Sequence, residues 1–528
     1  LMTQTISAPT PTQSSTPTPP HTAEHRPRLP LIFTALMLAM LLSSLGQTVF
    51  SAALPTIVGE LGGVDHMTWV ITAYLLGETI SLPLFGKLGD QIGRKGLFLG
   101  TLTGFVVGSL LGGLATSMTV LIVARAIQGT SAGGMMILSQ AITADVVSAR
   151  ERGKYMGIIG AVFGVSSVLG PVLGGWFTDG PGWRWGLWLN VPIGIVTIIV
   201  AALVLRVPAR EKKLTMDWLG ILTMIVATTS LILTVTWGGN EYDWTSPQII
   251  GLGITAVVFA AVFVLVELRA EDPLIPMTFF ANRNFVLTTS VGLAVGIFMF
   301  GSMSYLPTYL QMVHAMSPTT AGLMMTPMML GVMGTSTIVG GIVSRTGKYK
   351  RYPIIGMIAT AAALALLSTL EPDTSLVVIG LYLFLLGFGV GNAMQILVLI
   401  VQNSFPIAVV GTATAANNFF RQIGGAIGSA LVGGIFVANL RDQLATRMPA
   451  AIQELGADAA NYKDILASGT SRLTPAAVTH LPEPLRLAID YAYNDALTPV
   501  FLMLVPLALV SAVVLIFVRE DNLKDTIS

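Results

Sequence analysis

Long apolar runs recur along nearly the whole chain and constrain its fold more than any other feature. Fourteen runs begin near Leu31, Trp69, Leu97, Val120, Tyr155, Trp185, Trp218, Ile249, Phe285, Thr320, Pro353, Ser375, Gly411 and Leu497. Each holds the roughly 20 residues that a helix needs to cross about 30 Å of hydrocarbon. Only 10% of the residues are charged, which is too little polar surface for a soluble chain of this length. The sequence therefore predicts an all-α polytopic membrane protein with fourteen transmembrane helices.

Lysine and arginine are distributed unevenly among the connections between these runs. The connections after the second, fourth, sixth, eighth and tenth runs carry sixteen basic residues, whereas the short alternate connections carry only Arg184. Short loops that are rich in lysine and arginine stay on the cytoplasmic side of a membrane. The pattern predicts that the N and C termini are both cytoplasmic, as an even number of spans requires.

An internal repeat predicts how the chain is divided. Residues 86–95 (GKLGDQIGRK) and 340–349 (GGIVSRTGKY) share their glycine spacing and lie in equivalent predicted cytoplasmic hairpins. Repeated halves are a common way to build transporters. We expect six-helix bundles at residues 30–210 and 271–518, separated by an inserted helix pair at 211–270. The polar segments are expected to be a disordered cytoplasmic tail without a signal sequence at 1–29, a long extracytoplasmic loop at 439–496 and a cytoplasmic tail at 519–528.

One acidic residue lies in the middle of a predicted span. Glu78 is the only charged residue between positions 70 and 85. A carboxylate at this depth costs about 2.5–3.5 kcal/mol on insertion scales, so it is a functional-site candidate by default. Arg125, in the fourth run, is expected at a similar depth, and we interpret the two residues as a proton-coupling pair. One alternative is that Glu78 stays protonated and only joins neighbouring helices by a hydrogen bond. Another is that Arg125 is a structural cation whose donors are satisfied by backbone carbonyls or by Gln128.

Three segments resemble the major facilitator superfamily and, within it, the fourteen-span drug:proton antiporter family: residues 86–95, 125–129 and 164–175. The resemblance implies two bundles that expose one cavity alternately to the two sides of the membrane. It also implies that Asp90 and Arg94, with Gly86 and Gly93 of the same hairpin, form a cytoplasmic gate that holds the outward-facing state.

The first span departs from the family pattern. Gly46 stands where the family often carries an aspartate. The family's proton site in this span therefore does not carry over, and we hypothesise that Glu78 takes over its role.

The fifth span combines small residues with a proline. Gly164, Gly170 and Gly174 provide spacing that lets another helix approach closely. Pro171 removes a backbone donor and favours a bend. We expect this helix to take part in the conformational change, although packing alone is the alternative.

Polar and aromatic residues inside other spans are candidates for lining a substrate cavity. They are Gln47, Tyr305, Tyr309, Asn392, Gln395, Asn417, Asn418 and Arg421. Trp237, Tyr242 and Trp244 cluster at the outer end of the seventh run, where we predict an interfacial aromatic belt.

The residue inventory excludes several function classes. The chain has no cysteine, its five histidines form no metal-binding set, and it lacks a phosphate-binding nucleotide loop. We therefore expect neither an enzyme nor a metal or cofactor site, with the proton gradient as the energy source.

The function that fits best is export of amphipathic compounds, cationic or neutral, in exchange for protons. The alternatives are an exporter of an endogenous lipid, siderophore or other metabolite and, remotely, a non-transporting membrane sensor. We expect a monomer in a bacterial plasma membrane that contacts its small-molecule substrate and membrane lipids but no nucleic acid. An extracytoplasmic partner at residues 439–496 is a further expectation.

Overall fold

The computed structural model describes residues 29–62, 67–207, 214–239, 241–456 and 478–525. Thirteen of the helices in these segments are long and apolar enough to cross a membrane, and α14 (Arg351–Leu367) is a shorter apolar helix. These helices match the fourteen predicted spans, so the all-α polytopic fold is confirmed. The predicted tail at residues 1–29 lies outside the described residues apart from its last position, which begins α1.

In the N-terminal half α5 packs against α1, α3 and α4, and α1 packs against α5, α6 and α8. Its helices are α1 (Leu29–Thr48), α2 (Phe50–Leu61), α3 (Met67–Ile92), α4 (Arg94–Gly113), α5 (Met118–Val146), α6 (Ala149–Asp179), α7 (Trp185–Trp188) and α8 (Asn190–Val204). Serine side chains begin two of them, since Ser117 accepts from Val120 N at 3.3 Å and Ser148 accepts from Glu151 N at 3.4 Å. Gly93 separates α3 from α4 with φ of 96°, a conformation that favours glycine.

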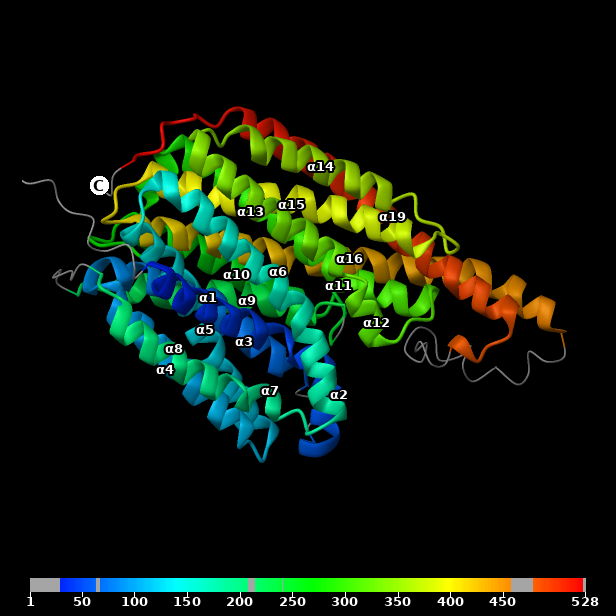
Figure 1. Cartoon of the computed structure of the whole chain (residues 1–528). Helices are drawn as coiled ribbons and strands as arrows, with labels where there is room; N and C mark the ends of the chain where they lie inside the picture. Colours follow the sequence, from blue (N-terminus) through cyan, green and yellow to red (C-terminus); the bar gives the residue numbers. More distant parts are fainter. Residues whose placement is uncertain (1–28, 63–66, 208–213, 240, 457–477, 526–528) are drawn as a thin grey trace, which may run out of the picture.

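The inserted pair consists of α9 (Trp218–Trp237) and α10 (Pro247–Glu267). The C-terminal half consists of η3 (Met277–Ala281), α11 (Arg283–Val313), α12 (Pro318–Leu323), α13 (Thr326–Thr346), α14, α15 (Leu376–Ser404), α16 (Val410–Leu455) and α19 (Glu483–Ile516). Figure 1 shows the two halves side by side, with α4 and α8 along one long edge of the molecule and α14 and α19 along the other.

Two seams join the halves. On one side α3 and α5 pack against α16, and on the other side α6 packs against α13 and α15. The inserted helix α9 contacts both α3 and α16, so it lies beside the first seam. Each half also has its own cluster of buried apolar side chains, so each can keep its shape if the halves move.

The predicted extracytoplasmic loop at residues 439–496 is wrong over much of its length, because α16 continues to Leu455 and α19 begins at Glu483. The 46 residues of α16 extend about 69 Å, more than twice the hydrocarbon thickness. Both helices project beyond their neighbours in Figure 1. Leu440 and Leu444 are buried one turn apart, whereas the charges of this segment lie mostly on its outer face. An amphipathic helix of this kind reads as polar in a hydropathy profile, which explains the error.

Candidate functional site

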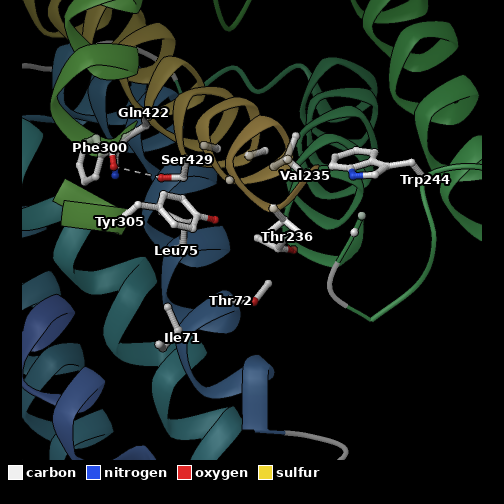
Figure 2. A pocket seen from close by; sticks show the side chains of 18 of the residues that line it. Ile71, Thr72, Leu75, Val235, Thr236, Trp244, Phe300, Tyr305, Gln422 and Ser429 are labelled. Carbon is white, nitrogen blue, oxygen red and sulfur yellow. Dashed lines mark hydrogen bonds between the residues drawn. The ribbon is translucent and has the colours of Figure 1, made fainter. Parts of the chain in front are cut away.

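A cavity of about 660 Å³ lies between the two halves. Its walls come from α3 and α5 of the N-terminal half, from α11 and α16 of the C-terminal half, and from α9 with the turn that follows it (Figure 2). Two predicted cavity residues, Gln47 and Tyr305, line it. The lining also reaches Arg125, one of the predicted coupling residues.

Arg125 is a fully buried cation that joins three helices of the N-terminal half. Its Nη1 donates to Gly46 O at 2.8 Å and to Gln128 Oε1 at 3.1 Å, and its Nε donates to Val70 O at 3.2 Å. The guanidinium lies between the rings of Phe50 and Tyr74, 4.3 and 4.2 Å from their centroids. All of these acceptors are neutral, and Nη2 has no hydrogen-bond partner among the described residues.

The space that an acidic side chain at position 46 would need is occupied by other side chains. A Cβ atom on Gly46 would lie 3.0 Å from Tyr74 Oη and 3.1 Å from the ring of Phe105. The hydroxyl of Tyr74 donates to Ser43 O at 2.5 Å, which fixes it there. This packing leaves little room for an aspartate at position 46, although Arg125 lies directly beside it.

Glu78 is buried one helical turn from Tyr74 on α3, with 5% of its surface exposed. Its Oε2 has no hydrogen-bond partner in the part of the chain that the structure describes. The charges of Arg421 in the C-terminal half and Arg125 in the N-terminal half both act on this carboxyl. The structure therefore brings together one buried acid of α3 and a buried cation from each half.

Three predicted cavity residues form a buried polar network instead of a cavity wall. Arg421 Nη2 donates to Asn418 Oδ1 at 2.5 Å, and Asn418 Nδ2 donates to Gln140 Oε1 at 2.6 Å across the seam with α5. Asn417 Nδ2 donates to Thr289 Oγ1 of α11 at 3.3 Å. These side chains hold α16 against its neighbours and do not line this cavity. The network of Arg421 and Asn418 fits the alternative that this polar patch locks the two halves in one state, and contact with substrate stays a prediction.

Three further residues predicted to line a cavity are packed between helices in this structure. Tyr309 is fully buried, and its hydroxyl donates to Asn494 Oδ1 of α19 at 2.9 Å. Asn392 donates to Phe388 O of its own helix at 2.9 Å. Gln395 is buried on α15, where a Cβ atom on Gly160 of α6 would lie 3.1 Å from its Cγ. These residues lie at a depth in the membrane where a cavity was expected, but their side chains contact helices and not the cavity.

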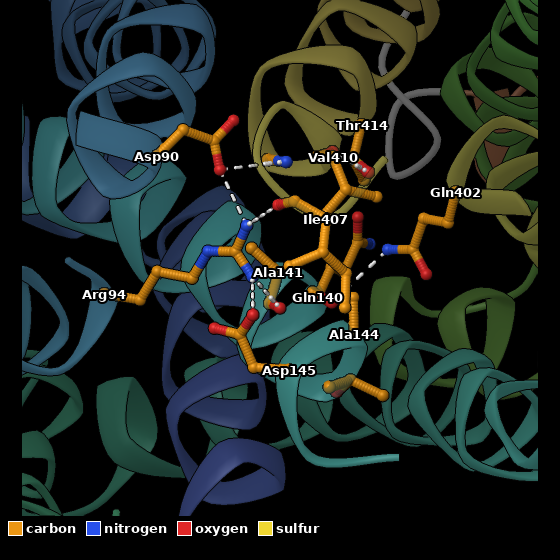
Figure 3. A network of polar contacts seen from close by, with 12 residues as sticks. Asp90, Arg94, Gln140, Ala141, Ala144, Asp145, Gln402, Ile407, Val410 and Thr414 are labelled. Atoms are coloured by element: carbon orange, nitrogen blue, oxygen red, sulfur yellow. Dashed lines mark hydrogen bonds and ion pairs between the residues drawn. The ribbon is translucent and has the colours of Figure 1, made fainter. Parts of the chain in front are cut away.

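The hairpin between α3 and α4 contacts the other half through Asp90 (Figure 3). Asp90 Oδ2 accepts from Thr412 N at 2.6 Å and Thr412 Oγ1 at 2.8 Å, and Oδ1 accepts from Gly411 N at 3.2 Å. These donors begin α16, where unpaired N–H groups and the helix dipole favour an anion. Close approach of the backbones is possible because Gly86 faces Gly411, whose carbonyl oxygen would lie 2.9 Å from a Cβ atom on Gly86.

Arg94 organises this contact from within the N-terminal half. Its Nη2 donates to Asp90 Oδ1 at 2.6 Å, and its Nη1 pairs with Asp145 Oδ1 at 2.7 Å. Nη2 also donates to Ile407 O of the other half at 3.3 Å. The side chain is fully buried, so the halves are closed on each other at this end of the molecule.

The segment after α19 adds a second connection at the same end. Glu520 Oε1 accepts from Tyr349 N at 2.8 Å, which ties the segment to the C-terminal half. Arg150 at the start of α6 pairs with Asp525 at 3.0 Å, and its backbone N donates to Lys524 O at 3.2 Å. Residues 519–525, predicted only as a cytoplasmic tail, therefore bridge the two halves. No pattern in the sequence indicates this contact.

The glycines of α6 face two different neighbours. A Cβ atom on Gly164 would lie 3.2 Å from Met329 O of α13, whereas Cβ atoms on Gly170 and Gly174 would overlap with the junction of α1 and α2. Pro171 lies inside the helix within the second of these contacts, between Gly170 and Gly174. The helix is thus in close contact with the C-terminal half at Gly164 and with the N-terminal half around its proline.

Trp244 was predicted as part of an interfacial belt, but it lines the cavity. Trp237 of the same cluster makes an edge-to-face contact with Trp69 of α3, with ring centroids 5.6 Å apart. The aromatic composition indicated the outer membrane boundary but not the face toward which each ring turns. That face is set by the packing of α9 between α3 and α16.

Two helix bundles that enclose a cavity, with one end of the molecule closed by contacts between them, define a secondary membrane transporter. The sequence profile of the Major Facilitator Superfamily matches residues 36–429. The chain belongs to this superfamily and is a multi-pass membrane protein.

Several relatives share most of the chain. It is 41% identical to an uncharacterized MFS-type transporter of Mycobacterium tuberculosis, over 94% of this chain and 70% of the relative. It is 34% identical to Multidrug resistance protein 3 of Bacillus subtilis, over 94% and 96% of the two chains. It is 37% identical to Multidrug transporter protein MdtP of the same organism, over 82% and 80%.

A solved structure supports the fold. The crystal structure of the human organic anion transporter MFSD10 superposes with a TM-score of 0.59 at 16% identity, covering 92% of this chain and 99% of that chain. At this identity the likeness concerns the fold alone.

Proposed function

We propose that this protein exports amphipathic compounds, cationic or neutral, in exchange for protons by alternating access. The observation that carries the proposal is the buried carboxyl of Glu78, whose Oε2 has no hydrogen-bond partner among the described residues and which lies within electrostatic reach of Arg125 in one half and Arg421 in the other. The names of the Bacillus subtilis relatives, which denote multidrug transporters, support the substrate class.

Under this proposal, the contacts that close one end of the molecule identify the conformational state of the transport cycle in which the structure lies. Asp90 and the 519–525 segment close the end that holds the C terminus, and the cavity lies toward the opposite end. With cytoplasmic termini, this is the outward-facing state. Substrate leaves and protons enter from the outside in this state, so a proton site must be ready to accept a proton in it.

Glu78 couples protonation to the arrangement of the halves. In its ionised form it attracts Arg421 across the seam and so favours the present arrangement. It forms no ion pair within 4.0 Å among the described residues, so the attraction is below about 4 kcal/mol at an effective dielectric constant of 20. Protonation removes this attraction and permits the inward-facing state, where release of the proton and capture of substrate reset the cycle. A difference of about 1.4 kcal/mol already changes the ratio of two states tenfold, so a part of this attraction is enough to bias the equilibrium.

The proposal is tested by transport in liposomes with an acidic interior. Outward proton flow should drive uptake of ethidium by the parent protein, and Glu78→Gln should abolish this uptake while keeping equilibrium binding of ethidium. Glu267→Gln is the matched control, because it replaces another buried glutamate that lies far from the cavity and keeps an oxygen for Ile275 N. Equal gradient-driven uptake by the parent and Glu78→Gln would refute the role of Glu78.

A second candidate is export of an endogenous lipid, siderophore or other metabolite. The observation that favours it is the projection of α16 and α19 beyond the other helices, which offers a docking surface for an extracytoplasmic partner. The projection is held together by the Arg447–Asp495 ion pair and a bond from Asn439 Nδ2 to Ala496 O at 3.1 Å. Labelled lipid that the parent, but not Glu78→Gln, moves between leaflets would support this candidate over drug export.

A further inference from the structure

The inserted helix pair forms one wall of the cavity. Val235 and Thr236 at the end of α9, and Asp243 and Trp244 in the turn that follows, all line it. Figure 2 shows Trp244 at one side of the cavity and Tyr305 with Phe300 at the other. The pair is therefore part of the proposed substrate site and more than a spacer between the two repeated halves.

Trp244 offers a flat apolar surface to this cavity. Its indole packs against Gly238 and Gly239 of its own turn and is 43% exposed. On α16 a Cβ atom on Gly434 would lie 3.8 Å from the indole, so the helix opposite presents no side chain there. With Tyr305 on the far side, the cavity has aromatic rings on two walls and small residues between them.

The pair is fastened to the N-terminal half at both ends of α9. At the outer end Trp237 packs on Trp69. At the cytoplasmic end Gln91 Nε2 of α3 donates to Thr215 O, just before α9, at 2.9 Å, and Lys87 of α3 pairs with Asp272 in the segment after α10. The wall that carries Trp244 is therefore anchored to α3, and α9 also packs against α16 and shares a buried apolar cluster with residues of the C-terminal half.

We propose that Trp244 is a substrate-contacting residue that makes the transporter prefer flat aromatic amphiphiles over globular ones of equal charge. A flat aromatic substrate can stack on the indole over its whole area, whereas a globular one touches only its edge. The charged groups of the lining, Arg125, Asp243 and Arg441, act equally on any two monovalent cations. This inference rests on the proposed export function and deepens it.

The test compares two permanent monocations of different shape. Ethidium is flat, whereas tetraphenylphosphonium carries four rings around a central atom. Trp244→Ala should raise the KM for ethidium about 3- to 10-fold and change that for tetraphenylphosphonium less than about 2-fold. Trp244→Phe should keep most of the preference. Trp218→Ala is the control at the opposite end of α9, where the side chain is 73% exposed, and it should change neither value.

Equilibrium binding of both cations to the purified, monodisperse variants separates this inference from the proposed function. Absence of transport by the parent would count against export, while a loss of ethidium binding confined to Trp244→Ala would still support the inference. Equal changes for both cations, or no change for ethidium, would overturn the role of Trp244.

Discussion

Replacement of Asp90 by asparagine should shift the protein toward the inward-facing state. Asp90 accepts three hydrogen bonds from the first residues of α16, which belong to the other half. When the halves separate at this end, water replaces these donors. A hydrogen bond to a charged group contributes about 1.5–3 kcal/mol, and because the bonds share one carboxylate we count this amount once. Loss of the charge should therefore change the ratio of the two states about 10- to 150-fold.

Distances between spin labels measure this ratio. The chain has no cysteine, so pairs can be introduced without a background. Positions 151 on α6 and 346 on α13 are exposed and lie at the closed end on opposite halves. The parent should show mainly the short distance, and Asp90→Asn should populate a longer one. Asp373→Asn, which changes an exposed acid in the loop between α14 and α15, should match the parent. An unchanged distance distribution in Asp90→Asn would refute the reasoning.

Three further predictions follow from single contacts. Arg125→Lys should reduce transport more than 10-fold and lower the thermal midpoint, because a lysine cannot both stack between two rings and donate to three acceptors; transport assays and thermal unfolding check this. Arg150→Ala should increase amide hydrogen exchange in residues 519–525, since it removes the ion pair with Asp525 and leaves only the backbone bond to Lys524 O, and unchanged exchange would contradict a role of the ion pair. The hydrogen bond from Arg184 lowers the pKa of Glu60 from its ordinary value of 4.5. The ionised carboxylate therefore stabilises the folded state fully above pH 4.5, and this stabilisation is lost as the pH falls through the lowered pKa. The midpoint difference between parent and Glu60→Gln should therefore shrink on acidification, and a constant difference would exclude this contribution.

The sequence predicted the membrane spans well, because a long apolar helix is dictated by the bilayer and needs no tertiary information. It also predicted a hairpin between two spans at residues 86–95, and the structure places Asp90 in the hairpin between α3 and α4. Both predictions depend on position along the chain and on the side of the membrane. These are quantities that hydropathy and charge report directly.

The rotation of each helix could not be predicted in the same way. Tyr309 and Asn418 lie at plausible depths for a cavity, yet both turn toward neighbouring helices. Trp244 was not predicted to line the cavity, because an aromatic residue of an interfacial belt and one that lines a cavity cannot be distinguished by sequence alone. In a membrane helix the lipid face and the packed face are both apolar, so periodicity does not distinguish them.

The most direct test of the account follows protons instead of substrate. Liposomes that contain the protein and an internal pH-sensitive dye receive ethidium from outside, without an imposed gradient. An antiporter that takes ethidium inward must move protons outward, so the parent should make the interior alkaline. Glu78→Gln should bind ethidium and leave the internal pH unchanged. Equal alkalinisation by the parent and Glu78→Gln would contradict the assignment of Glu78 as the proton-coupling residue.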